Sequence, residues 1–193
     1  MKNLQMKSEN QFSQDKKELR KSIKVKRAKI ENKSLLDSKI CMNFLSSSLY
    51  NDAKTVLTYC SLPDEINTDI IIKTALRDGK KVAVPYCVDD MGNMTFYYIN
   101  SFDDLHIGSF GVREPDTDKC KEVLDFDGAL IVLPGLCFDE NNYRLGYGKG
   151  YYDRFLEKHS LISVGLCYNS LIVKKVPTDI YDKKADFVIT EFA

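Results

Sequence analysis

The sequence predicts an α/β fold in which helices cover both faces of a mostly parallel sheet. Three observations lead to this class. Residues 129–133 form a wholly apolar run, as expected for a strand buried on both faces of a parallel sheet. Strand-like and helix-like segments alternate along the chain from residue 54 onward. The 193 residues are 44% hydrophobic and 29% charged, which is typical of one packed globular domain.

The first helix is expected in the charged N-terminal stretch. Between residues 12 and 31, apolar side chains such as Leu19 and Ile23 recur at near-helical spacing among Lys and Arg. Residues 1–11 are polar, so we expect a flexible N-terminus followed by a single domain over residues 12–193.

Three further helices are expected where caps and breakers enclose apolar residues. Ser34 is the expected N-cap of a helix that runs to residue 45, and Thr68 is the expected N-cap of a helix that Gly79 ends. The last helix follows a glycine-rich segment and spans residues 150–158.

The remaining strands are predicted from β-branched and aromatic runs that end at turn residues. They cover residues 55–59, 81–87, 94–99, 162–167 and 187–190. Residues 101–121 contain two glycines and a proline and are expected to be irregular.

Composition excludes several classes of protein. Lys+Arg and Asp+Glu are both 28, so net charge gives no support to a nucleic-acid or membrane partner. No apolar run approaches the roughly 18 residues of a membrane-spanning helix, and the N-terminus lacks the apolar centre of a signal peptide. The six cysteines are scattered without a CxxC pair, which favours reduced thiols in a cytoplasmic protein over disulfides or zinc.

A glycine-rich segment with a lysine follows the apolar strand. The glycines at 146, 148 and 150 let the backbone approach an anion, and the next helix offers free N–H groups at its N-terminus. Lys149 and Arg144 add positive charge at the same place. The segment matches neither GxxxxGK[ST] nor GxGxxG, yet it predicts a phosphate-binding site beyond the carboxyl end of a strand.

Asp153 lies in the first turn of that helix. A carboxylate there either complements the helix dipole or binds Mg²⁺. The second interpretation explains why an acid would lie beside phosphates. Tyr152, Phe155 and Leu156 share the face expected to pack in the core, so Tyr151 is the better candidate for the site.

Several segments together resemble the 5-formyltetrahydrofolate cyclo-ligase family. Residues 133–139 (LPGLCFD) and 144–154 (RLGYGKGYYDR) resemble its signature. Residues 16–20 (KKELR) resemble its N-terminal nucleotide contact, and residues 64–68 (DEINT) its folate contact. Residues 108–115 also fit, so the resemblance covers the chain from about residue 12.

The resemblance implies an ATP- and Mg²⁺-dependent enzyme that turns 5-formyltetrahydrofolate into 5,10-methenyltetrahydrofolate and releases ADP and phosphate. It also implies a three-layer α/β/α arrangement related to the ribose-phosphate isomerase and CoA-transferase group. The chemistry suits the residues: the formyl oxygen is a poor leaving group until it carries the γ-phosphoryl, after which N10 can attack the carbon. The protein's part is positioning and charge neutralisation.

The resemblance also implies roles for individual residues. ATP would be bound by Lys16, Lys17, Glu18, Leu19, Arg20, Arg144, Leu145, Gly146, Tyr147, Gly148, Lys149, Gly150, Tyr151 and Tyr152. The folate would be bound by Cys60, Glu65, Tyr147, Gly148, Lys149, Gly150 and Tyr151. Catalysis would rest on Lys149, Arg144 and Tyr151, and the metal on Asp153 and Asp186.

Some alternatives stay open. Without the resemblance, Lys16 and Arg20 would be read as a solvated basic helix face, and Glu65 as a solvated loop carboxylate. Asn142 stands where the family usually has Gly, and Asn tolerates the left-handed backbone such a turn needs.

Three other functions compete with this one. They are an ATP-dependent enzyme for another formylated or amide substrate, a non-catalytic nucleotide- or RNA-binding module, and a sugar-phosphate isomerase. The balanced charge argues against the RNA-binding module. The expected protein is a monomer that acts on small molecules, without nucleic-acid or membrane partners.

Overall fold

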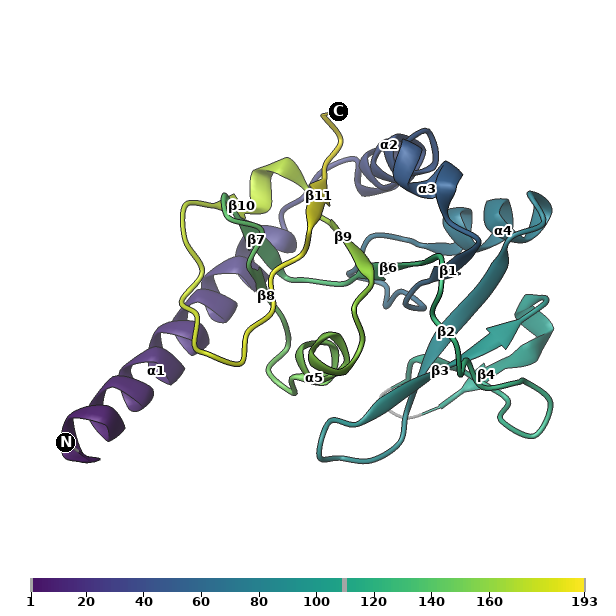
Figure 1. Cartoon of the computed structure of the whole chain (residues 1–193). Coiled ribbons are helices and arrows are strands. Elements are labelled where there is room, and N and C mark those ends of the chain that lie inside the picture. The colour runs from purple at the N-terminus through teal and green to yellow at the C-terminus, as the bar shows by residue number, and fades with distance from the viewer. Residues whose placement is uncertain (1, 109–110, 193) are drawn as a thin grey trace.

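The computed structural model describes residues 2–108 and 111–192 (Figure 1). Within these ranges, six strands form the central sheet, in the order β11 (Phe187–Ile189), β9 (Ile162–Leu166), β6 (Ala129–Leu133), β1 (Thr55–Leu57), β2 (Lys81–Cys87) and β3 (Met94–Ile99). Neighbouring strands are parallel except for β2 and β3, which are antiparallel. The mostly parallel sheet predicted from the sequence is confirmed, and β6 is buried along its whole length.

Helices lie on both sides of this sheet. They are α1 (Lys2–Arg27), α2 (Lys33–Leu45), α3 (Ser48–Asp52), α4 (Asp69–Arg77) and α5 (Tyr151–Lys158). Figure 1 shows α2, α3 and α4 on one side and α5 on the other. Phe155 of α5 packs its ring 4.9 Å from that of Phe96 in β3, which joins this helix to the core. The expected helix-covered sheet is therefore confirmed.

The N-terminal helix departs from its expected limits. The structure begins α1 at Lys2 rather than at residue 12, and ends it at Arg27 rather than near residue 31. Figure 1 shows the N-terminal part of α1 extending away from the sheet. Residues 2–11 are mostly polar and lack a regular apolar spacing, which is why the periodicity did not reveal this part of the helix. The flexibility expected for residues 1–11 stays a prediction.

Of two predicted helix caps, one is wrong and one is confirmed in position. The N-cap of α2 is Asn32, in the left-handed conformation at φ 52°, and Ser34 lies inside the first turn. Thr68 is the N-cap residue of α4, as expected, but its hydroxyl donates to the carbonyl of Tyr59 at 2.6 Å and makes no hydrogen bond to the helix. Tertiary partners outcompete the local cap at this site. Gly79 does end α4, at φ 75°, as expected.

The segment expected to be irregular contains a short hairpin. A 3₁₀ turn at Phe102–Asp104 leads into β4 (Leu105–Ile107), which pairs antiparallel with β5 (Arg113–Pro115). Two further features were not predicted from the sequence: α3, and a small sheet of β10 (Ile172–Val173), β7 (Cys137–Asp139) and β8 (Arg144–Leu145). Elements of two to five residues carry too little periodicity to be read from sequence.

Phe138 fixes the small sheet against the central one. It is fully buried, and a Cβ added at Gly135 or Gly165 would lie 2.6 Å or 2.3 Å from its ring. The two glycines therefore make room for this ring between β7 and β9. The contact holds the β7–β8 hairpin, and with it Arg144, at the edge of the core.

The remaining features agree with the composition. In the part of the chain that the structure describes, no helix is both long and apolar enough to span a membrane. The cysteines are free thiols, as expected, and all are buried except the half-buried Cys87.

Candidate active site

The glycine-rich loop runs over the surface between β8 and α5. Tyr147, Gly148 and Lys149 are exposed. Gly148 and Gly150 have φ values of 103° and 72°, which a side chain would strain, and Gly150 is the N-cap of α5. The loop thus brings a flexible cationic side chain to a helix N-terminus, where the backbone N–H groups lack helical partners. This arrangement suits a phosphate group.

The first helix contributes to the same place. Arg20 donates from Nε to the carbonyl of Gly146 at 2.9 Å. A Cβ added at Gly148 would lie 3.2 Å from its guanidinium, so Arg20 runs along the loop. The structure therefore brings two segments together that are 126 residues apart in sequence.

The other residues of the segment 16–20 have different surroundings from those of Arg20. Lys16 forms ion pairs with Asp182 at 2.6 Å and Asp179 at 3.0 Å, in the loop before β11. Although burial alone would lower it, the pKa of Lys16 is raised by its hydrogen bonds to these two carboxylates. Lys17 and Glu18 are exposed, and Leu19 packs against the core.

Arg144 is buried and pairs with Asp153. Its guanidinium lies 2.8 Å from Asp153 Oδ1 and donates to the carbonyl of Lys183 at 3.0 Å. The backbone N–H of Lys183 donates to the same Asp153 oxygen at 3.0 Å. Asp153 thus joins α5, β8 and the segment before β11. In this structure Arg144 is an ion-pair partner under the loop rather than an exposed cation on it.

The two predicted metal ligands, Asp153 and Asp186, hydrogen-bond to different partners. Asp186 accepts hydrogen bonds on Oδ2 from the backbone N–H and the hydroxyl of Ser163, both at 2.8 Å. Asn142 donates to the carbonyl of Asp186 and has the left-handed φ of 66° that its place in the turn requires. Within residues 2–108 and 111–192, no three His, Cys, Asp or Glu residues are grouped as a metal cluster.

The first two residues of α5, Tyr151 and Tyr152, point to different surroundings. Tyr151 donates its hydroxyl to the carbonyl of Asp89 at 2.8 Å, in the β2–β3 turn. Tyr152 packs against the core with Phe155 and Leu156, as predicted. The ring of Tyr152 lies 5.9 Å from the Arg144 guanidinium.

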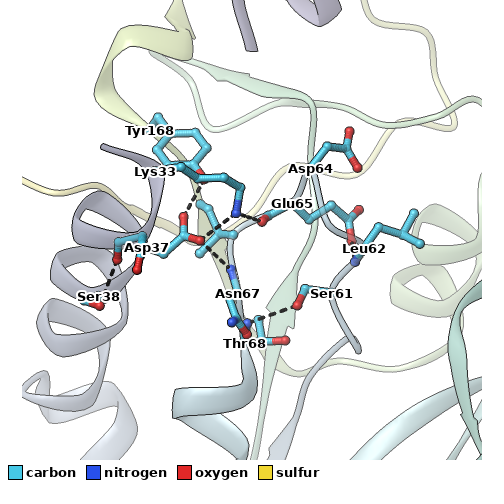
Figure 2. A network of polar contacts seen from close by, with 12 residues as sticks. Lys33, Asp37, Ser38, Ser61, Leu62, Asp64, Glu65, Asn67, Thr68 and Tyr168 are labelled. Atoms are coloured by element: carbon cyan, nitrogen blue, oxygen red, sulfur yellow. Dashed lines mark hydrogen bonds and ion pairs between the residues drawn. The ribbon is translucent and has the colours of Figure 1, made fainter. Parts of the chain in front are cut away.

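Glu65 lies in a buried bend between β1 and α4 (Figure 2). Its Oε2 accepts from the backbone N–H of Leu62 at 2.9 Å. Burial raises the pKa of this carboxyl group, and the backbone hydrogen bond opposes the rise. The hydroxyl of Tyr147 reaches the carboxylate of the adjacent Asp64 at 3.4 Å. The glycine-rich loop therefore meets the Glu65 loop.

Cys60 is buried beside an ion pair. Burial raises the pKa of its thiol to about 12, so it is protonated at neutral pH. Arg113 and Asp69 pair next to it, with one guanidinium nitrogen 2.5 Å from a carboxylate oxygen. The thiol therefore has no thiolate chemistry at this pH.

Two cavities flank the Glu65 loop. One, of about 490 Å³, is lined by residues of α2, of the loop itself, of α4 and by Arg113. The other, of about 390 Å³, lies between α1 and the loop and is lined by Lys24, Arg27, Tyr147 and Tyr168 among others. Both have the size of a small-molecule site.

Two arginines that were not among the predicted site residues shape the site. Arg27 is buried and donates to the carbonyls of Asp64 at 2.6 Å and Gly135 at 2.9 Å. Arg154 donates to the carbonyls of Lys149 and Gly92. Helical spacing from Arg20 to Arg27, seven residues later on one face, was the available signal for the first.

These contacts bring the loop, the first helix and the Glu65 bend into one region. The sequence model of the 5-formyltetrahydrofolate cyclo-ligase family matches residues 12–191. The chain belongs to this family. The enzyme class expected from the sequence is thereby confirmed at the level of the family.

Relatives and solved structures agree with the family assignment. A probable 5-formyltetrahydrofolate cyclo-ligase of Schizosaccharomyces pombe is 30% identical over 166 residues, covering 78% of this chain and 81% of the relative. The 5-formyltetrahydrofolate cyclo-ligase of Mus musculus is 30% identical over 158 residues, covering 76% and 78%. The NMR structure of Aquifex aeolicus 5,10-methenyltetrahydrofolate synthetase matches with a TM-score of 0.81 at 30% identity, covering 92% of this chain and 90% of that chain.

Proposed function

We propose that this chain converts 5-formyltetrahydrofolate into 5,10-methenyltetrahydrofolate, using ATP and Mg²⁺ and releasing ADP and phosphate. Besides family membership, one geometric observation supports the proposal. Tyr147 of the glycine-rich loop reaches Asp64, the residue next to Glu65, at 3.4 Å. A loop suited to phosphate and a bend suited to the folate thus share one region, as phosphoryl transfer between the two substrates requires.

The proposed reaction has two steps on the formyl group. The formyl oxygen attacks the γ-phosphorus and ADP leaves. N10 of the folate then attacks the formyl carbon, the carbon–oxygen bond breaks with phosphate as the leaving group, and N10 loses its proton. We assign to Lys149 the role of neutralising the negative charge on the transferring phosphoryl group, because its side chain is exposed on the loop. Glu65 would accept hydrogen bonds from the pterin N–H groups.

The proposed nucleotide contacts come from α1 and the N-terminus of α5. Arg20 already lies along the loop through Gly146. Lys16 pairs with Asp179 and Asp182, so its contact with ATP would exchange those carboxylates for phosphate oxygens. Arg144 would act from beneath the loop, through its ion pair with Asp153.

The donor set fits Mg²⁺ held jointly by protein and nucleotide. Mg²⁺ commonly takes one or two carboxylates and completes its shell with phosphate oxygens and water, so a cluster of three acids is not needed. Asp153 uses Oδ1 for Arg144, which makes Oδ2 the oxygen we assign to the metal. Asp186 uses Oδ2 for Ser163, which leaves Oδ1 for the same role. Bound there, the ion would neutralise phosphate charge.

One assay tests the function. The protein is mixed with 5-formyltetrahydrofolate and Mg²⁺, with and without ATP, and the methenyl product is followed by its near-ultraviolet absorbance. We expect product only when ATP is present. Folded protein that forms no product would refute the proposal. A sugar-phosphate isomerase would instead turn over its own substrate without ATP.

We further propose a monomer that works on small molecules in the cytoplasm, without nucleic-acid or membrane partners. Free cysteines suit a reducing compartment, and the balanced charge gives no basis for a polyanionic partner. Light scattering on the purified chain should give the mass of one copy, 22.1 kDa.

A further inference from the structure

A buried carboxylate in α2 gathers hydrogen bonds from three parts of the chain. Asp37 has only 4% of its surface exposed. Its Oδ2 accepts from Lys33 Nζ at 2.6 Å and from the backbone N–H of Asn67 at 3.2 Å. Its Oδ1 accepts from the hydroxyl of Tyr168, just after β9. Figure 2 shows Lys33 and Asp37 of α2 meeting Tyr168 and the Glu65 loop at this point.

The same network holds the backbone of the Glu65 loop. Lys33 Nζ also donates to the carbonyl oxygen of Glu65 at 2.5 Å (Figure 2). Glu65 and Asn67 flank the buried Ile66, so α2 fixes the loop on both sides of this residue. The contacts made by α2 therefore add to those that the loop receives from the backbone N–H of Leu62, from Arg27 at Asp64 and from Tyr59 at Ile66.

The network also separates the two cavities. Lys33 lines both of them, Asp37 lines the larger one, and Tyr168 lines the smaller one. Lys33 and Asp37 form an ion pair with each other, and both also hydrogen-bond to the backbone of the loop. Asp37 and Tyr168 are buried and Lys33 is partly exposed, and a hydrogen-bonded network around a buried carboxylate rigidifies the segments it contacts.

We propose that Lys33, Asp37 and Tyr168 are positioning residues that hold Glu65 in the orientation in which it binds the folate. This inference rests on the proposed function, because it deepens the role of Glu65 in the same site. The three residues act through the backbone of residues 65–67. Loss of the lysine contact lets the loop shift, and a displacement of about 1 Å at a substrate contact can cost on the order of 100-fold in rate.

Lys33→Met is the first test, because it keeps most of the stem and removes Nζ. We expect the KM for 5-formyltetrahydrofolate to rise about tenfold while the KM for ATP stays unchanged. Amide hydrogen exchange at residues 62–68 should become faster. Lys33→Arg can still donate to both partners, so its KM for 5-formyltetrahydrofolate should stay close to that of the wild type. Lys39→Met, at an exposed site on the same helix, is the matched control.

A second variant covers the possibility that Lys33→Met fails to fold. Tyr168→Phe removes one oxygen and leaves Lys33 on Asp37, so a smaller rise in folate KM is expected. Equal rises in both KM values, or unchanged exchange at residues 62–68, would overturn the inference. If the wild-type protein forms no methenyl product, the proposed function fails, and the exchange experiment alone decides whether Lys33 holds the loop.

Discussion

The buried guanidinium of Arg144 lies 2.8 Å from the carboxylate of Asp153, nine residues later in the chain. The side chains of Arg144 and Asp153 are 4% and 23% exposed. The same carboxylate oxygen accepts from the backbone of Lys183. This pair thus fastens both ends of the glycine-rich loop to the segment before β11.

Asp153→Ala should destabilise the fold strongly, because it leaves the Arg144 charge buried without its partner. Breaking a buried pair costs about 3 kcal/mol or more, which urea denaturation would measure as a loss in the free energy of unfolding. Glu157→Ala is the matched control, since its pair with Lys183 is 57% and 35% exposed and should contribute less than about 1 kcal/mol. Similar small losses in the free energy of unfolding for both variants would contradict the structural role of the Arg144–Asp153 pair.

Lys149→Ala should remove activity without removing stability. The side chain is exposed, so the melting temperature should stay near that of the wild type. Loss of a charge that stabilises the transition state should lower kcat by roughly 100-fold or more. Steady-state methenyl formation measures this, and the exposed Lys175→Ala serves as the control. A parallel loss of melting temperature and turnover would count against the assigned role.

Gly92→Ala should disturb the glycine-rich loop from the β2–β3 turn. Gly92 has φ 92°, and an added Cβ would lie 2.8 Å from the backbone oxygen of Lys149 and closer still to Arg154. We expect lower stability together with a lower kcat. Gly79→Ala carries similar backbone strain at φ 75° but meets nothing within 4 Å. This control should cost about 1 kcal/mol without affecting kcat. The same kcat in both variants would show that the turn does not position the loop.

Glu65→Gln should stabilise the folded protein at pH 7 while weakening folate binding. Burial raises the folded-state pKa of Glu65 above its ordinary value of 4.5, so the ionised form costs stability above the folded pKa. That cost fades as pH falls to about 4, where the carboxyl group is protonated in both states. Gln can still accept from Leu62. Melting temperatures at pH 7 and pH 4 check this, with exposed Glu140→Gln as the control. A stabilisation that persists unchanged at pH 4 would contradict the burial argument.

Arg20→Met should weaken ATP binding more than folate binding, since Arg20 lies along the loop at Gly146. Loss of one charge-assisted contact is worth about 1.5–3 kcal/mol, or roughly a 10- to 100-fold rise in the KM for ATP. Lys21→Met, one position further along α1 and exposed, is the matched control. If both variants affect the ATP KM equally, α1 acts only through its general charge.

Local sequence was informative where one segment carries its own signal. The apolar run of β6, the glycine that ends α4 and the core face of α5 were all predictable, since each depends on residues within one turn or strand. The cap at Ser34 was not, because α2 begins after Asn32 in the left-handed conformation. Thr68 is the N-cap of α4 as predicted, but its hydroxyl donates to the carbonyl of Tyr59 and not to the helix. Short elements such as β8 and β10 form only through pairing with β7.

The amino-acid sequence is enough to identify the family and the glycine-rich loop with its lysine, and it predicts which residues bind ATP, folate and Mg²⁺. The surroundings of these residues depend on the tertiary structure. It buried Arg144 against Asp153, set Lys16 between two aspartates, and fixed Glu65 through Lys33. These relationships join residues 9 to 166 positions apart. Such contacts depend on how the elements pack together, which local patterns do not encode.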